Sequence, residues 1–316
     1  MSRLFRQSLS EGRVPSGWKH GRITACHKAG PKNNPENYRP ISLLPIVSKV
    51  LETIVNRRLL RFLTEHKAIP DHQFGFRTGR SALDMAAHTT QRWSNSLDKG
   101  HEVRVVSLDL SRAFDRVWHR GLMEKLAACG IYGHLLEWLT GFLHGRSQSV
   151  VVNGQESIPT PVRAGVPQGS VLGPTLFLVF LRDMGEGLRS ELDHYADDST
   201  LHHVIDNRLD RNRTADIINE DLCSIQRWAD TWCAQFNATK THVLTISRAR
   251  DAANSHPPLF LANQRLVEAN SLSPSLVYAS TSACLGETTS VNSPSDAEEC
   301  WVHFVARVSA CRRMPF

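Results

Sequence analysis

A run of apolar and β-branched residues at 101–110, HEVRVVSLDL, constrains the fold of this chain more than any other feature. Such a run is typical of a strand buried on both faces. From residue 103 to residue 247 the pattern reads as a strand, two helices, a hairpin and helix, a second hairpin, a helix and a closing strand. This order predicts an α+β fold, in which a decorated β-α-β-β-α-β antiparallel sheet carries helices on one face.

The spacing of apolar residues, helix-capping residues and turn residues predict the remaining helices and the first hairpin. Helical spacing of apolar residues predicts amphipathic helices at about 46–66, 118–129, 132–144 and 214–233. Another helix should begin at Ser81, because Asp84 completes a capping-box pattern, and a buried helix should begin near Pro174. Asn153-Gly154 lies between strand-like arms and predicts a type I′ hairpin.

The two ends of the chain differ from its middle. Residues 1 to about 40 are rich in Lys, Arg, Asn and Pro and read as loops with short strands. After about residue 250 the chain becomes rich in Ser, Thr and Pro without a periodic apolar face. We therefore expect a poorly structured or degenerate tail over 251–316.

Net charge and cysteine content indicate which partners and which cellular compartment to expect. The 316 residues carry a formal net charge of +6 and a pI near 9.1, which suits a polyanionic partner such as nucleic acid. Seven cysteines without a CxxC pair argue against a secreted disulfide framework. Cys300, His303 and Cys311 fit no closed four-ligand zinc pattern. Without a signal peptide or a membrane-length apolar run, we expect an intracellular protein of the nucleus or cytoplasm.

Two neighbouring carboxylates, Asp197 and Asp198, lie within the second predicted hairpin. At about 4 Å and an effective dielectric of about 20, they would repel by roughly 4 kcal/mol. Either a surface turn holds them apart in water, or a cation lies between them. Asp109 ends the apolar strand, where it could cap a loop or pair with the same cation. Three converging carboxylates would suit Mg²⁺ ions, and two such ions about 3.5–4 Å apart catalyse phosphoryl transfer.

Several blocks of the sequence resemble one family in order and spacing. The blocks are SLDLSRAFDRVWH (107–119), AGVPQGSVLGPTLFLVFLRDM (164–184), YADDST (195–200), FNATKTHVL (236–244), and upstream NYRPISLLPIVSKVLE (37–52) and QFGFRTGRSALD (73–84). Together they resemble the reverse transcriptase of non-LTR (LINE-type, Jockey-like) retrotransposons over roughly residues 10–250. The resemblance implies a right-hand polymerase that acts as an RNA-directed DNA polymerase.

The resemblance also implies catalytic roles. Asp109 matches the first catalytic aspartate, and Asp197 with Asp198 matches the pair at the tip of the palm hairpin, so that all three would bind Mg²⁺, with Mn²⁺ as a possible substitute. Lys240 matches the lysine proposed to protonate the departing pyrophosphate. Asp115 also matches the family pattern, and we interpret it as structural rather than as a metal ligand.

A second set of residues matches the nucleotide-binding positions of the family. Phe114 corresponds to the aromatic steric gate that clashes with a 2′-hydroxyl, although it could be ordinary core. Gln168 and Gly169 correspond to a turn that contacts the nucleotide and template, or they form only a helix-entry turn. Arg39 and Lys28 correspond to finger residues that bind the triphosphate.

The implied subdomains and partners follow from the same comparison. Residues 1–100 would form the fingers, with about 145–165 returning to them, and 101–250 would form the palm. The start within the fingers predicts no N-terminal endonuclease, and 251–316 matches no intact thumb. The expected partners are an RNA template, a DNA primer and dNTPs, with no membrane and no oligomeric state implied. Two alternatives remain: a non-catalytic nucleic-acid-binding remnant, and an RNA-making polymerase of the same architecture, which Phe114 disfavours.

Overall fold

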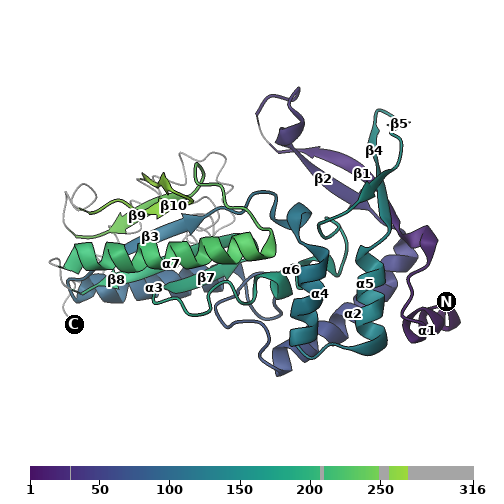
Figure 1. Cartoon of the computed structure of the whole chain (residues 1–316), viewed down its shortest axis with the longest axis horizontal. Helices are drawn as coiled ribbons and strands as arrows, with labels where there is room; N and C mark the ends of the chain where they lie inside the picture. Colours follow the sequence, from purple (N-terminus) through teal and green to yellow (C-terminus); the bar gives the residue numbers. More distant parts are fainter. Residues whose placement is uncertain (29, 207–209, 249–255, 270–316) are drawn as a thin grey trace, which may run out of the picture. The chain divides into compact units, whose positions relative to one another are not determined.

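The computed structural model describes residues 1–28, 30–206, 210–248 and 256–269. The chain divides into two compact units. Unit 1 comprises Met1–Asp71, Arg112–Met184 and Asp230–Gln235, and unit 2 comprises His72–Ser111, Gly185–Ala229 and Phe236–Phe316. Figure 1 labels the helices and strands of both. No helix within the described ranges combines the length and apolar character needed to cross a membrane.

Unit 2 is built on one five-stranded sheet. Its strands, in spatial order, are β12 (Val267–Glu268), β9 (His242–Ile246), β3 (Glu102–Leu108), β8 (Asp198–Ile205) and β7 (Glu191–Tyr195). β3 pairs antiparallel with both β8 and β9, β7 pairs antiparallel with β8, and β12 adds to β9 in parallel. The strands β9-β3-β8-β7 therefore have the order of a β-α-β-β-α-β antiparallel sheet.

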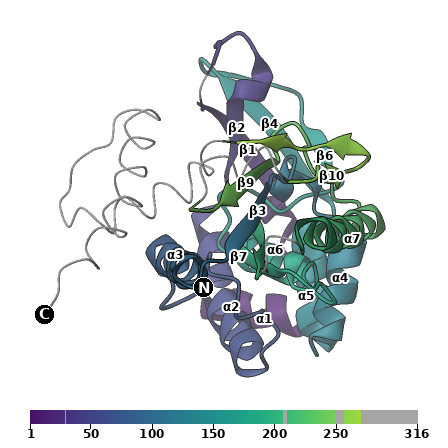
Figure 2. The same cartoon turned by 90° about the vertical axis from the view of Figure 1, so that its left-hand side faces the viewer.

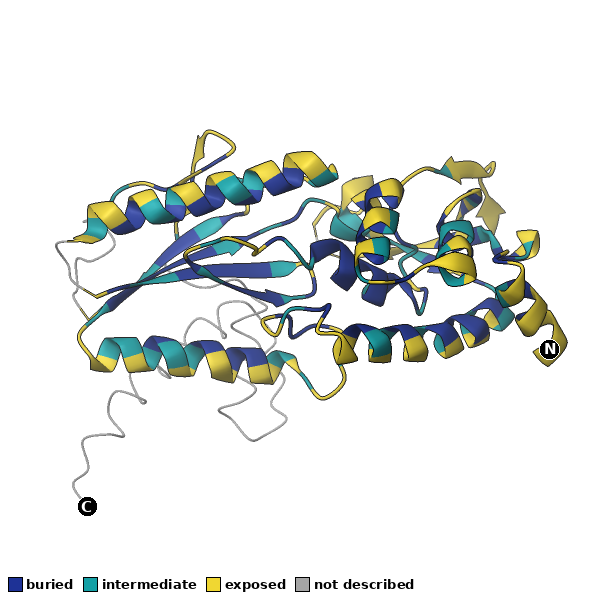
Figure 3. Ribbon diagram, turned by 60° about the horizontal axis from the view of Figure 1, so that its bottom comes forward, coloured by how far each residue is buried: buried dark blue, intermediate teal, exposed yellow. Residues whose placement is uncertain are grey.

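Helices cover both faces of this sheet, whereas the sequence pattern predicts helices on one face. α3 (Ala82–Asp98) packs Trp93 against Val103 and Val105 of β3. Figures 2 and 3 show the strands between α3 and α7 (Arg211–Trp232). Asp221 of α7 accepts hydrogen bonds from the backbone N–H groups of the residues before β7, Arg189 and Ser190. The physical reason is that residues 102–106 of β3 are all buried, so each face needs a covering layer.

Unit 1 combines a small sheet with helices. The sheet has the order β2 (Tyr38–Leu43), β1 (His20–His27), β4 (Arg146–Val152) and β5 (Gln155–Glu156), with β6 (Thr160–Val162) paired to β4. The helices are α1 (Ser2–Ser10), α2 (Ile46–Glu65), α4 (His119–Ala128), α5 (Gly133–Leu143) and α6 (Gly173–Leu181). The predicted hairpin is confirmed, because Asn153 and Gly154 have the positive φ angles, 50° and 79°, of a type I′ turn.

The N-terminal helix α1 was not predicted, since residues 1–40 read as loops and short strands. The helix forms because its buried face has specific partners in unit 1. Trp138 of α5 donates an Nε1–H hydrogen bond of 2.9 Å to Ser8 Oγ, and the Phe5 ring meets Trp18 edge-on at 6.2 Å. Six of the nine residues of α1 are polar or charged, which is why the composition of this segment reads as loop.

Part of the predicted tail is also folded. Residues 260–268 form β10 (Phe260–Leu261), β11 (Gln264–Arg265) and β12, and Leu261 is 1% exposed. The Phe260 N–H donates to Asn219 Oδ1 on α7 at 2.9 Å. Cross-strand pairing and these side-chain contacts stabilise a segment whose composition alone predicts no structure. Residues 270–316, including Cys300, His303 and Cys311, lie outside the described residues.

A buried carboxylate joins α2 to the start of α6 within unit 1. Glu52 is 0% exposed. Its Oε2 accepts hydrogen bonds from the backbone N–H groups of Val171 at 2.8 Å and Leu172 at 3.4 Å, and its Oε1 accepts one from Ser48 Oγ at 3.0 Å. The carboxylate thus satisfies donors that precede the first turn of α6, where a negative charge is also favourable.

We expect Glu52→Ala to lower the free energy of unfolding by about 2–4 kcal/mol, because it leaves buried N–H donors without an acceptor. Denaturant unfolding of the purified protein measures the change. Glu65→Ala, at the exposed end of the same helix, should change it by less than about 0.5 kcal/mol. Equal losses for the two variants would contradict this role of Glu52.

Candidate active site

The register of β3 and β8, continued one residue beyond the end of β3, sets two of the three predicted catalytic aspartates opposite each other in unit 2. The antiparallel register of β3 and β8 pairs Leu108 with Ser199, so that the next pair in that register is Asp109 opposite Asp198. Directly opposite residues project from the same face, with Cβ atoms about 5 Å apart. Asp197 precedes Asp198 in the turn of the β7–β8 hairpin. The three aspartates therefore belong to the same end of this sheet, although their carboxylate oxygens do not form a group within 4.8 Å of one another.

The backbone around Asp109 is fixed by a loop that follows α7. The Asp109 N–H donates to Thr241 Oγ1 at 3.3 Å, and the Asp109 carbonyl accepts from the Asn237 N–H at 2.8 Å. The Thr241 hydroxyl donates in turn to the Asn237 carbonyl at 2.9 Å. Lys240 belongs to this loop, and its side chain is exposed. The structure thus brings the backbone of the Lys240 loop to the strand end that carries Asp109.

A glutamine that the sequence analysis did not assign holds the hairpin turn. Gln73 is 2% exposed, and its Oε1 accepts hydrogen bonds from the backbone N–H groups of Gly75 at 2.9 Å and Ala196 at 3.2 Å. Ala196 has φ +60°, in the left-handed region, immediately before Asp197. An acceptor at this place stabilises an unfavourable turn conformation. Gln73 therefore fixes the backbone of the turn that contains Asp197.

The segment around Gln73 also touches the hairpin through its backbone. Phe74 N–H donates to the His194 carbonyl, and His194 N–H donates to the His72 carbonyl, both at 2.8 Å. A Cβ added to Gly75 would lie 2.3 Å from Ala196 N, so only glycine permits this approach. The sequence signal is the block QFGFRTGRSALD, which carries the family resemblance but assigns no role to Gln73 or Gly75.

The predicted nucleotide-binding residues all belong to unit 1. Arg39 pairs with Cys26 across β1 and β2, and the Lys28 N–H donates to the Asn37 carbonyl at 2.8 Å just beyond β1. In this register Lys28 and Arg39 are diagonal neighbours on one face. Both side chains are exposed, so two cations project from the same hairpin.

The Gln168-Gly169 turn packs against the same hairpin. The Gln168 carbonyl accepts from Ser42 N–H of β2 at 2.7 Å. Gly169 has φ +105°, and a Cβ there would lie 2.7 Å from the Ser42 carbonyl oxygen, so the position requires glycine. Gln168 Nε2 donates to Asp115 Oδ1 at 2.8 Å. Partial burial raises the pKa of the Asp115 carboxyl, while the bond from Gln168 and the charges of Arg112 and Lys28 oppose that rise.

Phe114 is partly exposed and anchored at the same time. Its ring stacks on the buried Phe177 of α6, with centroids 4.4 Å apart and 21° between the planes. Its carbonyl accepts from the Val166 N–H at 2.8 Å. This arrangement gives a rigid aromatic surface, a property that both a steric gate and a core residue require.

Residues 30–281 match the profile of the family described as reverse transcriptase (RNA-dependent DNA polymerase), which is most of the chain. This chain belongs to the reverse transcriptase family. It is 38% identical over 239 residues to a probable RNA-directed DNA polymerase from transposon BS of Drosophila melanogaster, which covers 72% of this chain and 26% of the relative. It is 34% identical over 253 residues to the RNA-directed DNA polymerase from mobile element jockey of the same species, covering 77% and 27%.

A solved structure shows the same fold. This reverse transcriptase chain matches telomerase from Candida tropicalis in complex with a fragment of telomeric RNA, with a TM-score of 0.53 and 12% identity. The match covers 98% of this chain and 56% of the telomerase chain. The chain spans about a quarter of the length of the curated relatives that it matches.

The donor set of this reverse transcriptase fits a hard divalent cation. Asp109 and Asp198 are half-buried and Asp197 is exposed. All three offer only oxygen ligands, which Mg²⁺ prefers. A bound ion would also offset the mutual repulsion of carboxylates on adjacent positions.

Proposed function

We propose that this chain is the polymerase part of a non-LTR retrotransposon protein, and that it extends a primer 3′-hydroxyl with dNTPs on an RNA template. The observation that carries the proposal is the register that sets Asp109 opposite Asp198, beside Asp197 in the hairpin turn. In this assignment residues 1–100 act as the fingers and 101–250 as the palm. The similarity to RNA-directed DNA polymerases of mobile elements supports the reaction.

Each predicted residue has a role in the proposed reaction. Asp109, Asp197 and Asp198 would hold two Mg²⁺ ions, which supply charge neutralisation for the attacking hydroxyl and the leaving phosphate oxygen. Lys28 and Arg39 bind the triphosphate from one face of the β1–β2 hairpin. Lys240 donates a proton to the departing pyrophosphate.

The turn and the aromatic residue of unit 1 would set the shape of the nucleotide site. Gln168 contacts the incoming nucleotide and the template, and Asp115 orients its side chain by accepting the hydrogen bond from Nε2. Gly169 lets the turn approach β2 closely. Phe114 excludes a 2′-hydroxyl, so that deoxynucleotides are selected.

Primer extension tests the proposal. The purified chain is incubated with an RNA template annealed to a DNA primer, dNTPs and Mg²⁺, and extended products are resolved by length. We expect template-dependent extension that stops when EDTA removes the metal. Absence of extension with either Mg²⁺ or Mn²⁺, by a chain shown to be folded, would overturn the proposed function.

The net charge of +6 favours a second candidate, a nucleic-acid-binding protein without catalysis. Its signature would be binding of the template–primer that weakens steeply with salt, together with no addition of nucleotide. Fluorescence anisotropy of a labelled template–primer, run beside the extension assay, distinguishes the two candidates.

Phe114→Val should weaken discrimination against ribonucleotides by about 5- to 150-fold. The reason is that an overpacked contact costs about 1–3 kcal/mol, and a smaller side chain removes the clash with the 2′-hydroxyl. The ratio of incorporation efficiencies for a dNTP and the matching rNTP measures the effect. Phe62→Val, at a partly buried phenylalanine of α2, is the matched control and should leave the ratio unchanged. An unchanged ratio in Phe114→Val would assign Phe114 to the core alone.

A further inference from the structure

A completely buried carboxylate lies in unit 2 beneath a group of imidazoles. Asp193 of β7 is 0% exposed. Its Oδ1 is 2.9 Å from His72 Nδ1, and its Oδ2 is 3.4 Å from Thr89 Oγ1 and 3.8 Å from His202 Nδ1. Within the described part of the chain, no lysine or arginine nitrogen lies within 4.0 Å of this carboxylate. A buried carboxylate of this kind is costly unless a positive charge compensates it.

His88 of α3 completes a group with the donor atoms of a metal site. One ring nitrogen of His72, one of His88 and one carboxylate oxygen of Asp193 all lie within 4.8 Å of one another. Ligands about 2.0–2.1 Å from a tetrahedral ion are about 3.3 Å apart, so small side-chain rotations close the set. Both histidines are exposed, so these rotations displace no buried side chain.

The neighbouring cation does not prevent this arrangement. Arg92 Nη1 lies 3.5 Å from His88 Nε2, but the same guanidinium forms an ion pair with Glu191. Glu191 also contacts His202 Nε2 at 3.2 Å. The charge of Arg92 is therefore compensated by a carboxylate other than Asp193.

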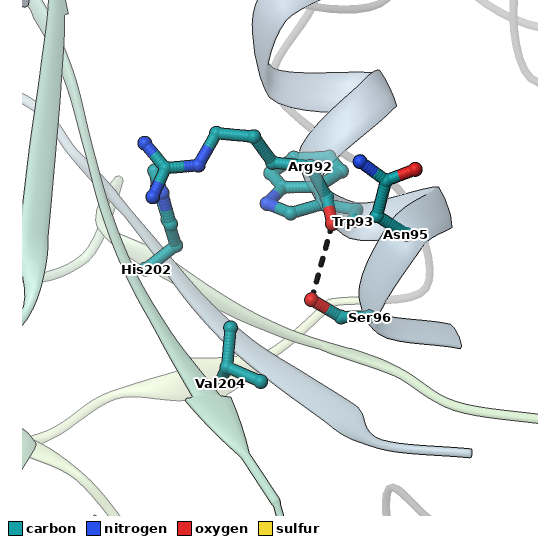
Figure 4. A pocket seen from close by; sticks show the side chains of 6 residues that line it. All are labelled: Arg92, Trp93, Asn95, Ser96, His202 and Val204. Atoms are coloured by element: carbon teal, nitrogen blue, oxygen red, sulfur yellow. Dashed lines mark hydrogen bonds between the residues drawn. The ribbon is translucent and has the colours of Figure 1, made fainter. Parts of the chain in front are cut away.

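A second observation comes from His202, which lies behind Asp193. His202 is 3% exposed, and its Nδ1 has no hydrogen-bond partner among the described residues although it faces Asp193 Oδ2. Its ring and Trp93 line a cavity of about 200 Å³, together with Arg92, Asn95, Ser96 and Val204 (Figure 4). His202 thus lies on the side of Asp193 where an outer-shell partner of a metal ligand would lie, at a separation of 3.8 Å that is longer than a hydrogen bond.

We infer that His72, His88 and Asp193 bind a zinc-like transition-metal ion, separate from the aspartates that are proposed to bind Mg²⁺. Two nitrogens and one oxygen suit Zn²⁺, which leaves a fourth position for water, whereas Mg²⁺ selects oxygen ligands. The site joins the segment that starts at His72, helix α3 and strand β7. The same segment carries Gln73, so the ion would tie together the parts that support the hairpin turn.

Metal titration of the full chain tests the inference. After chelation and dialysis, Zn²⁺ is added in competition with a chromophoric chelator, and thermal unfolding is followed with and without Zn²⁺. We expect wild type to bind Zn²⁺ in the presence of millimolar Mg²⁺ and to unfold at a higher temperature. His72→Ala and His88→Ala should each weaken this binding at least about 100-fold and abolish the thermal shift.

His134→Ala is the control variant. It removes an exposed histidine of α5 in unit 1 and should bind Zn²⁺ as wild type does. Circular dichroism in the absence of metal shows whether the variants fold, and His88→Gln provides a second variant if His88→Ala does not. Equal Zn²⁺ affinity in wild type and in both ligand variants would overturn the inference, as would no Zn²⁺ binding by wild type. Because the readout is metal binding, failure of the inference is distinct from failure of the polymerase proposal.

Discussion

Asp109→Asn should reduce dNTP incorporation at least about a thousandfold, which corresponds to about 4 kcal/mol of lost transition-state stabilisation. The amide keeps the size and the backbone contacts of Asp109 but removes the negative charge opposite Asp198. Single-turnover primer extension on an RNA template measures the loss directly. Binding of template–primer should change little, because the substitution adds no bulk and removes no cation.

Asp216→Asn is the matched control for this experiment. Asp216 is an exposed residue of α7 in the same unit, and the substitution changes the net charge by the same amount. Its incorporation rate should stay within about twofold of wild type. If Asp109→Asn and Asp216→Asn extend primers equally well, Asp109 does not take part in the chemistry.

Gly75→Ala is expected to give the second largest effect, a loss of at least about a hundredfold in incorporation. The new Cβ would lie 2.3 Å from the Ala196 backbone nitrogen, so the hairpin turn or the Gln73 segment must move. A displacement of about 1 Å at reacting groups costs on the order of a hundredfold in rate, and overpacking also costs about 1–3 kcal/mol of stability. Primer extension and denaturant unfolding measure the two effects.

Gly17→Ala provides the control for backbone substitution at glycine. A Cβ at Gly17 meets no atom within 4 Å, so stability and incorporation should remain near wild type. Incorporation by Gly75→Ala at the wild-type rate would show that the close approach to Ala196 does not position the aspartates. Loss of stability alone, with the rate per folded molecule unchanged, would lead to the same conclusion.

Local chemistry explains the parts of the fold that the sequence predicted well. Ser81 and Asp84 form the expected capping box, in which Asp84 N–H donates to Ser81 Oγ and Ser81 N–H donates to Asp84 Oδ2. Asn153 and Gly154 adopt the positive φ angles that their type of turn requires. α2 spans Ile46–Glu65 against an expected 46–66. In each case the decisive interactions lie within a few residues of the pattern.

Features that depend on distant partners were missed or misjudged. α1 is held by Trp138, which is 130 residues away along the chain. The local sequence of residues 2–10 contains no sign of this contact. Residues 260–268 are ordered by pairing with β9 and by contacts with α7, in spite of a composition typical of loops. The role of Gln73 depends on Ala196, more than a hundred residues later.

The two candidate sites differ in the same way, since one has a local signal in the sequence and the other depends on distant contacts. The apolar run before Asp109 and the adjacent pair Asp197-Asp198 pointed to a shared cation site as one of two interpretations, the other being a loop cap and a solvated surface turn. The grouping of His72, His88 and Asp193 gave no comparable signal, since isolated histidines and an aspartate in a strand are common. Only the pairing of β7 with β8 and the packing of α3 against the sheet bring them together.

Uptake of Mn²⁺, followed by electron paramagnetic resonance of the unbound ion, tests most directly whether the three aspartates hold catalytic cations. Wild type and Asp109→Asn are compared in the presence of template–primer and a non-reacting dNTP analogue, and both carry His88→Ala to exclude the inferred zinc site. We expect the aspartate variant to bind fewer Mn²⁺ ions, or to bind them at least about tenfold more weakly. The same number of ions bound with the same affinity in both proteins would contradict the account.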